Sequence, residues 1–139
     1  MATENPTMDK ELQKLYLQMQ MLEQQSQQLQ KQIQAIDQQV GELESIKAGL
    51  EQLQAVKPGT EIFVQFAGGI FIKAELKDNK DLLLNVGAST AVTKSTEGTI
   101  GTISAQVMEM AELRQKMVEQ LDRVIEKARD LEQEMEKLV

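Results

Sequence analysis

Paired carboxylates are the side chains of this sequence whose spacing comes nearest to catalytic chemistry. Glu132 and Glu136 lie four residues apart, and Glu119 and Asp122 lie three apart, so a helix would place each pair on one face. Such a pair can act as general acid and base when a cleft holds both groups around a substrate. No feature of the surrounding sequence predicts a cleft, and we interpret both pairs as the solvated face of a helix.

The composition excludes most other catalytic and metal-binding chemistry. The 139 residues contain no His, Cys or Trp. Their absence rules out a Cys/His zinc site, a disulfide framework, a cysteine nucleophile and a Ser-His-Asp triad. Gly68 and Gly69 are not followed by the Lys-Ser/Thr of a phosphate-binding loop, so we predict that they and Gly87 are turn residues with positive φ. We expect neither an enzyme nor a bound metal or cofactor.

The charge and the hydropathy pattern narrow the choice of partners. The chain has 22 acidic and 15 basic residues and a net charge of −7, which disfavours general binding to nucleic acid. It has no run of about 18 apolar residues that could span a membrane. Residues 1–8 lack the basic flank and the apolar stretch of a signal peptide. We expect a soluble cytoplasmic protein with no nucleic-acid or membrane partner.

Residues 1–56 carry a sustained heptad pattern. With Leu12 as position a, ten of the twelve a and d positions are apolar, and the positions between them are mostly Gln, Glu and Lys. This pattern predicts a coiled-coil helix that starts at Asn5-Pro6 and stops at Lys57-Pro58-Gly59. The a positions are Leu12, Met19, Ser26, Ile33, Val40 and Lys47, and the d positions are Leu15, Leu22, Leu29, Ile36, Leu43 and Leu50.

The end of this helix and the polar seam positions break the regular pattern. Leu43, Ile46, Leu50 and Leu53 are spaced by three, four and three residues, which predicts a stammer that rotates the apolar seam. We expect the polar residues of both heptad series to set the register or to loosen the coil locally. These residues are Ser26, Lys47 and Arg114.

Residues 96–139 repeat the heptad pattern, with eleven of twelve positions apolar. We predict a second coiled-coil helix that has Ser95 as its N-cap and runs to residue 139. Gly98 and Gly101 would then lie in its first two turns at a cost of about 1 kcal/mol each, which leaves a start near Thr102 open. The two series are Ile100, Val107, Arg114, Leu121, Ala128, Met135 and Ile103, Met110, Met117, Val124, Leu131, Leu138.

The segment between the helices has a period of two instead. Four short runs rich in β-branched, aromatic and leucine residues, within residues 60–94, are separated by Gly- or Asn-containing loops and predict two β-hairpins in series. Hairpins of this kind leave sheet edges and an apolar face without a partner, so we expect them to form an assembly surface. Its candidate contacts are Ile62, Val64, Phe66, Ile70, Ile72, Leu83 and Val86.

Together these segments predict an α+β fold: a long antiparallel α-helical coiled coil with two central β-hairpins. The polar faces of both helices are rich in Gln and charge, so their apolar stripes have no other core to enter than each other. We expect one subunit spanning 1–139, with a coiled-coil helix in 1–56, the hairpins in 57–95 and a second helix in 96–139. The two chain ends would then lie together at the tip farthest from the hairpins.

Taken as a whole, the sequence resembles a known family, the prefoldin subunits. A helix, two hairpins and a helix in about 140 residues is the layout of the alpha class, whereas the beta class has one hairpin. The segment Val64–Ala74 is similar to the first hairpin of archaeal alpha subunits, and Asn85–Ser95 to the second hairpin that leads into the C-terminal helix. The resemblance covers essentially the whole chain, but Gly98 and Gly101 depart from the pattern of the family.

The resemblance implies a chaperone that works without ATP. It implies a hexamer of two alpha and four beta subunits whose hairpins form a double β-barrel platform. The tips of its six coiled coils would hold unfolded protein clients and pass them to a group II chaperonin. The client contacts expected at the tips are Met8, Leu12, Leu15, Tyr16, Met19, Leu131, Met135, Leu138 and Val139.

Two interpretations of these tip residues stay open. Leu15, Leu22 and Leu131 can be ordinary packing positions of the coil, whereas Tyr16 and Met8 lie outside the heptad series and favour exposed contacts. If about ten residues of the first helix overhang the second, Leu12 and Leu15 would stay partly exposed.

The alternative to a chaperone subunit is a homo-oligomeric coiled-coil scaffold or filament built from the same parts without client transfer. A transcript-cleavage-type factor, which inserts an acidic coiled-coil tip into a polymerase, is disfavoured because the hairpins lie between the helices. In such a factor the tip of the coiled coil would be a loop, whereas in this chain the tip far from the hairpins would consist of the two chain ends.

Overall fold

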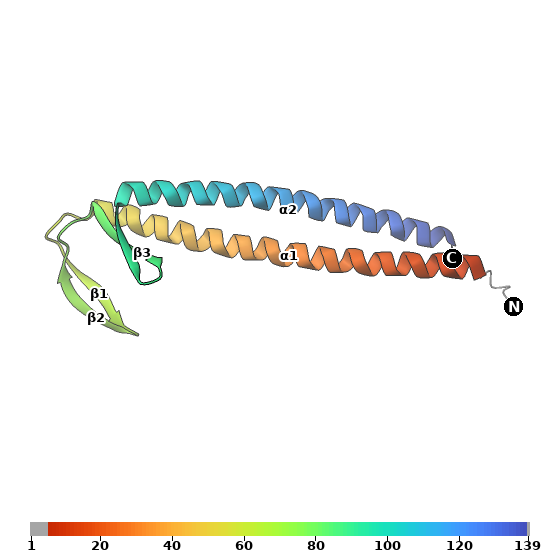
Figure 1. Ribbon diagram of the computed structural model, residues 1–139, viewed down its shortest axis with the longest axis horizontal. Helices are drawn as coiled ribbons and strands as arrows, with labels where there is room; N and C mark the ends of the chain where they lie inside the picture. The colour runs from red at the N-terminus through yellow and green to blue at the C-terminus, as the bar shows by residue number, and fades with distance from the viewer. Residues whose placement is uncertain (1–5, 139) are drawn as a thin grey trace. The chain divides into compact units, whose positions relative to one another are not determined.

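The computed structural model describes residues 6–138 and contains two long helices and four short strands (Figure 1). The chain divides into two compact units, one made of residues up to Gln39 and from Met110 onward, the other of Val40–Glu109, and both helices contribute to both units. The predicted helix start at Asn5 lies outside the described residues. The elements are α1 (Pro6–Ala55), β1 (Glu61–Ala67), β2 (Ile70–Glu75), β3 (Asp81–Gly87), β4 (Thr90–Ser95) and α2 (Thr96–Leu138).

The seam of α1 follows the predicted heptad. Among residues 7–55, the side chains that are buried or half-buried are the twelve predicted a and d positions and Leu53. Leu15, Ile33 and Ile36 are buried, and the other positions are half-buried. One apolar stripe along a single face is what a helix needs in order to pack against one partner helix. The prediction of a coiled-coil helix is confirmed.

The predicted stammer at Ile46 is wrong. Ile46 is 52% exposed, whereas its neighbour Lys47 is half-buried and keeps the a position of the regular heptad. A lysine can occupy this place because its aliphatic stem lies along apolar surface while the ammonium group stays in water. The seam therefore continues in phase to Leu50, and only Leu53 departs from the heptad.

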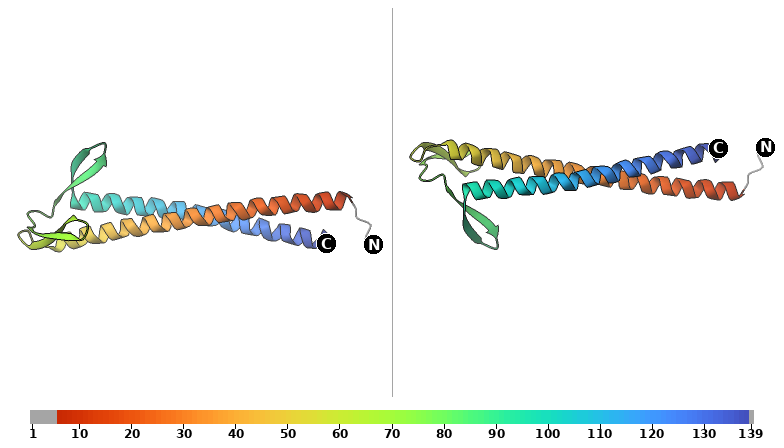
Figure 2. Two further views of the ribbon diagram at one scale, coloured as in Figure 1. Left: turned by 90° about the horizontal axis from the view of Figure 1, so that it is seen from below. Right: turned by 90° about the horizontal axis from the view of Figure 1, so that it is seen from above.

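In the first unit the two helices lie side by side and run in opposite directions (Figures 1 and 2). Asp37 of α1 binds Arg114 of α2, with 2.6 Å between Nε and Oδ1 and 3.4 Å between Nη2 and Oδ2. The hydrogen bond to Asp37, and then its charge, raise the pKa of Arg114. Because both side chains are about half exposed, we interpret this ion pair as fixing the register more than adding stability.

The second helix also has the predicted seam. Eleven of its twelve predicted positions are buried or half-buried, and Arg114 is the exposed one. The helix starts at Thr96, with Ser95 as the predicted N-cap: the Gly98 amide donates to Ser95 Oγ over 2.9 Å. A Cβ atom on Gly98 would lie only 2.7 Å from that oxygen, so glycine suits the third helical position here. The alternative start near Thr102 is wrong.

The four strands form two separate antiparallel hairpins, as predicted. Val64 pairs with Ile72 across the first hairpin, and Leu84 pairs with Val92 across the second. The predicted positive φ angles occur at Gly69 and Gly87, but the prediction for Gly68 is wrong. The two-residue loop of the first hairpin needs a left-handed conformation only at its second residue.

The loop of the second hairpin is unusual. Ala88 and Ser89 both have positive φ, 50° and 59°, as in a type I′ turn. Such turns match the right-handed twist of paired strands and normally contain Asn-Gly, because a Cβ atom disfavours this region. The turn is therefore strained at two consecutive residues.

A network of hydrogen bonds around Asn79 joins the loop between the two hairpins to both helices of the second unit. The Asn79 side-chain amide donates to the carbonyl oxygens of Gln54 (3.2 Å) and Val56 (2.8 Å) at the end of α1. The Thr96 hydroxyl donates to the Asn79 carbonyl over 2.8 Å, and the Thr96 amide donates to the Lys80 carbonyl over 2.7 Å. Thr96 is 1% exposed. The network thus satisfies carbonyl groups that the end of α1 leaves without helical partners.

The burial pattern of α1 predicts that replacing each of two isoleucines lowers the free energy of unfolding by a different amount. Ile33→Ala in the full chain should lower the free energy of unfolding by about 2–4 kcal/mol, because it removes a buried side chain. Ile46→Ala should lower it by less than about 1 kcal/mol, since Ile46 is exposed. Urea unfolding followed by circular dichroism measures both values. Equal losses would contradict the assigned phase of the heptad.

The strained turn predicts a stabilising change. Replacing Ala88 by Asn and Ser89 by Gly should raise the free energy of unfolding by about 1–2 kcal/mol, because both new residues tolerate positive φ. Thermal unfolding of the full chain gives this value, and the single change Ser89→Gly should give part of it. A double variant less stable than the parent would show that the turn is not of this type.

Candidate binding surfaces

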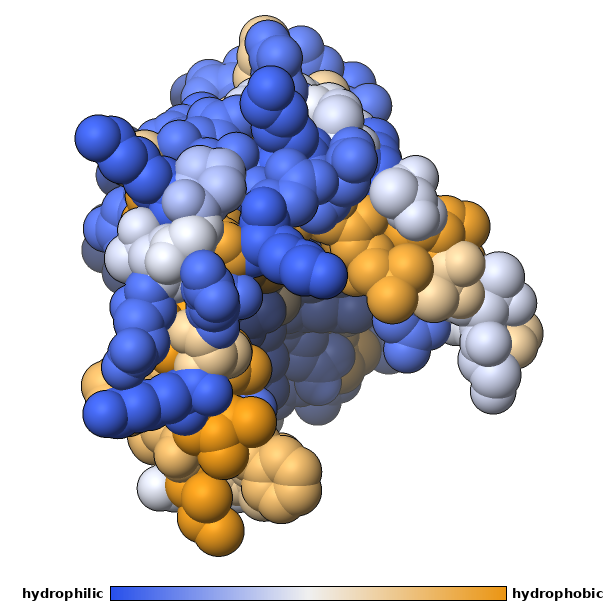
Figure 3. Space-filling model, turned by 90° about the vertical axis from the view of Figure 1, so that its left-hand side faces the viewer, coloured by the Kyte–Doolittle hydropathy of each residue, from blue (hydrophilic) through white to orange (hydrophobic). Residues whose placement is uncertain are grey.

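The hairpins present the predicted assembly residues to solvent. Ile62 is half-buried, and the other six predicted contacts are exposed. Figure 3 shows apolar side chains gathered over the hairpins. The exposed members are Val64, Phe66, Ile70, Ile72, Leu83 and Val86.

The sequence prediction missed apolar residues on the other face of the first hairpin. Phe63 and Phe71 are exposed, and Phe63 alternates along β1 with Ile62 and Val64. The prediction assumed a single apolar face, although an apolar run on both faces is typical of strands that become buried on both sides. Each hairpin is also a two-stranded sheet with two open edges. Such sheets are marginal on their own, so these hairpins fit a surface that other subunits cover.

The predicted contacts of the first unit divide by exposure. Met8 and Tyr16 are exposed, and Tyr16 is 57% accessible. Val139 lies outside the described residues. The others, apart from Leu15, are half-buried seam positions: Leu12, Met19, Leu131, Met135 and Leu138.

Of the two interpretations left open for Leu15, its accessibility of only 8% favours a packing position over a partly exposed overhang. Met19 and Met135 line the same groove, so in an antiparallel pair the turn of α1 before Met19 lies across from the turn of α2 after Met135. The second helix therefore reaches Leu15 and covers it. Leu15 is a packing residue of the seam.

Two further exposed apolar residues lie close to Tyr16 along α1. Leu17, which the sequence prediction missed, and Met21 are each 63% accessible. They are four residues apart, so they are neighbours on the helix surface. Leu17 occupies an outward heptad position, where a coiled coil normally has a polar residue, and that was the available signal. We call Tyr16, Leu17 and Met21 the outer patch.

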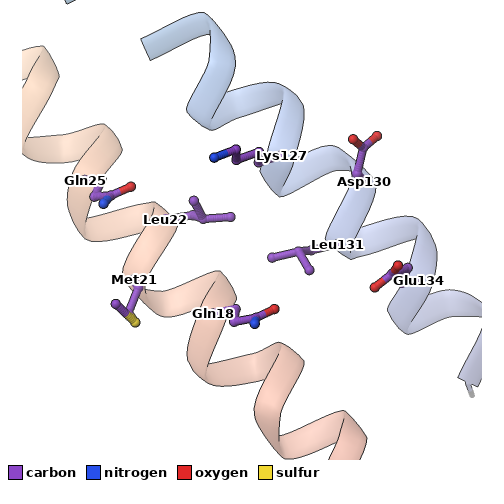
Figure 4. Close-up of a pocket in the computed structure, with 8 residues that line it drawn as sticks. All are labelled: Gln18, Met21, Leu22, Gln25, Lys127, Asp130, Leu131 and Glu134. Carbon is purple, nitrogen blue, oxygen red and sulfur yellow. The ribbon is translucent and has the colours of Figure 1, made fainter. Parts of the chain in front are cut away.

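Grooves flank the seam of the first unit, where the helices do not enclose it. One groove, of about 430 Å³, has Leu22 of α1 and Leu131 of α2 pointing toward each other across it (Figure 4). Its remaining lining residues are Gln18, Met21, Gln25, Lys127, Asp130 and Glu134. A second groove, of about 590 Å³, is lined by two methionines and three glutamates, and we call it the Met–Glu groove. Its residues are Met19, Glu23, Glu132, Met135 and Glu136.

Neither a metal-binding cluster nor a membrane-spanning helix is found among residues 6–138. Within 6–138, no group of three or more His, Cys, Asp or Glu side chains is placed to hold a metal ion. Neither α1 nor α2, over the same residues, has a stretch apolar enough to cross a bilayer.

Two long helices joined by two hairpins with exposed apolar side chains are the layout of a known family. The family model described as "Prefoldin subunit" matches residues 22–139, so the chain belongs to the prefoldin subunit family. The family resemblance stated from the sequence is confirmed. Its curated relatives place it with the archaeal alpha class.

Three of these relatives, each described as prefoldin subunit alpha, show the range of similarity. The protein of Thermofilum pendens is 23% identical over 91 residues, which are 66% of this chain and 70% of that protein. The protein of Methanobrevibacter smithii is 30% identical over 83 residues, 60% of this chain and 56% of that protein. The protein of Methanococcus aeolicus is 24% identical over 132 residues, 95% and 90% of the two chains.

A solved structure supports the fold. The cryo-EM structure of filamentous PFD from Methanocaldococcus jannaschii matches with a TM-score of 0.70 at 16% identity, covering 82% of this chain and 94% of that chain. The chain is thus an alpha-type subunit of a chaperone family whose alpha subunits assemble into prefoldin complexes.

The exposed hairpins predict which substitutions block assembly. The double variant Phe66→Ser with Leu83→Ser should lower the mass of the complex that this subunit forms with its partners. Each change removes an apolar side chain that is exposed in the single subunit and available to a partner subunit. Met108→Ser is the control, since Met108 is similarly exposed but lies on α2. Light scattering after size-exclusion chromatography measures the particle mass. An unchanged mass for the double hairpin variant would exclude the hairpins as the main assembly surface.

Proposed function

We propose that this chain is the alpha subunit of a cytoplasmic holdase, a hexamer of two alpha and four beta subunits that captures non-native proteins and passes them to a group II chaperonin. The observation that carries the proposal is the apolar outer patch on the acidic, Gln-rich helices of the first unit. Exposed apolar clusters on proteins commonly mark binding sites. Tyr16, Leu17 and Met21 lie on α1 away from the hairpins along the chain, so assembly through the hairpins leaves them available.

Capture in this proposal is passive. Hydrophobic contact is non-directional and fits clients without a fixed shape, and methionine side chains adapt to irregular surfaces. Each subunit offers few apolar side chains, so a single contact should be weak. Several subunits held on one platform would retain a client through effective concentration. No nucleotide is needed, and the released client would go to the chaperonin.

A self-assembled filament is the second candidate. The related structure from Methanocaldococcus jannaschii is described as filamentous, and open hairpin edges can pair with further copies as well as with a different subunit. Purification of the chain alone separates the two proposals. A defined long particle from one chain would favour the filament, and assembly that requires a one-hairpin partner would favour the hexamer.

The outer patch gives the test of client capture. Replacing Tyr16, Leu17 and Met21 by Ser should strongly reduce the ability of the assembled protein to prevent aggregation of a chemically unfolded model protein. Light scattering without nucleotide measures this activity. The control carries Ile46→Ser and Met108→Ser, which remove exposed apolar side chains from the second unit instead.

The triple patch variant should keep its helical content and its particle mass, because all three side chains are exposed. Full activity in that intact particle would exclude the outer patch from client capture. Equal losses in the patch variant and the control would indicate a general effect of surface hydrophobicity rather than a site.

A further inference from the structure

We propose that the Met–Glu groove binds apolar client segments that carry Lys or Arg, so that the chaperone prefers basic over acidic non-native polypeptides. This inference rests on the proposed function, and it names the chemistry of the clients that this part of the first unit selects. Its basis is the lining of the groove, which combines an apolar floor with carboxylates of one sign.

The floor of the groove consists of one methionine from each helix. Met19 of α1 and Met135 of α2 are seam positions, and both are half-buried. A thioether side chain has several rotatable bonds and adapts to partners of different shape. The floor can therefore accept a variety of apolar side chains, including the aliphatic stems of Lys and Arg.

The rim of the groove is acidic. Glu23 of α1 and Glu132 and Glu136 of α2 are exposed and line the groove, and no basic residue lines it. A Lys or Arg whose stem lies on the methionines can place its charged group beside these carboxylates. An acidic segment in the same place would bring like charges together without compensation. Charge complementarity thus selects a basic apolar segment as the occupant.

A neighbouring groove in the first unit has the opposite character. It is lined by Gln side chains together with Arg123 and Lys127, over a floor that includes Leu29 and Val124, and it has no acidic lining residue. A basic segment would meet like charges in that groove. The preference for basic clients should therefore come from the Met–Glu groove and not from the net charge of the helices.

Two labelled peptides test the preference. One is a short amphipathic peptide of Leu and Lys, and its twin carries Glu in place of each Lys. Fluorescence anisotropy with the full-length assembled protein should show about tenfold tighter binding of the basic peptide, as expected for a few partly exposed charge pairs. That difference should shrink as salt is added, since exposed charge pairs are screened.

The variant with Glu132→Gln and Glu136→Gln should lose most of the difference between the peptides. The control with Glu112→Gln and Glu126→Gln makes the same change of charge on exposed positions of α2 that line neither groove, and should keep it. Circular dichroism checks that both variants retain their helices.

The outcomes separate this inference from the proposed function. Equal affinities for the two peptides, in a protein that prevents aggregation through its outer patch, would overturn the charge preference alone. Equal losses in the two Glu→Gln variants would also overturn it, because net charge would then suffice. If the triple patch variant prevents aggregation fully and neither peptide binds, the proposed function itself fails.

Discussion

Burial of one apolar stripe of α1 against one stripe of α2 is the interaction on which the whole subunit depends. The buried apolar side chains of the described residues are few: Leu15, Ile33, Ile36 and Ile103. The remaining seam positions are mostly half-buried, because two helices cannot enclose their contact as a bundle of four can. A two-stranded coil therefore keeps part of its own core accessible along both flanks of the seam.

This incomplete enclosure connects stability with function. Met19 and Met135 contribute to the seam and at the same time form the floor of a groove, and Leu22 and Leu131 do the same on another groove. The side chains that hold the helices together thus also remain accessible from solvent. The hairpins follow a different constraint: Phe63 and Phe71 cannot be covered by their own chain. Half-buried seam residues are compatible with a stable pair of helices. The exposed apolar side chains of the hairpins, in contrast, call for burial by partner subunits.

The sequence predicts those parts of the fold that a simple period determines. The heptad gives the seam of both helices almost residue by residue, alternation gives four strands, and Ser95 gives the start of α2. The prediction of the α1 seam fails where the preference for an apolar residue competes with the heptad spacing. The predicted stammer followed the apolar Ile46, whereas the seam keeps Lys47 at its heptad position a, because a lysine stem fits the seam.

Other features depended on geometry that the sequence does not contain. The sequence left the exposure of Leu15 open, because the axial offset of the two helices is set by their pairing. The ion pair of Asp37 and Arg114 marks the observed register. The left-handed conformations of Ala88 and Ser89 follow from a two-residue loop between paired strands, against the preference of both residues. The grooves arise from the spacing of two helices, so neither their volume nor their lining could be predicted from one stripe.

Site-specific photo-crosslinking tests the central claim, that clients contact the first unit and not the second. A photoreactive residue at Met21, at Met135 or at Met108 in the full-length assembled protein would be activated in the presence of a chemically unfolded client. All three positions lie on the long helices, with Met108 in the second unit. The account predicts crosslinks to the client from positions 21 and 135 and few from position 108. Crosslinks mainly from position 108 would contradict it.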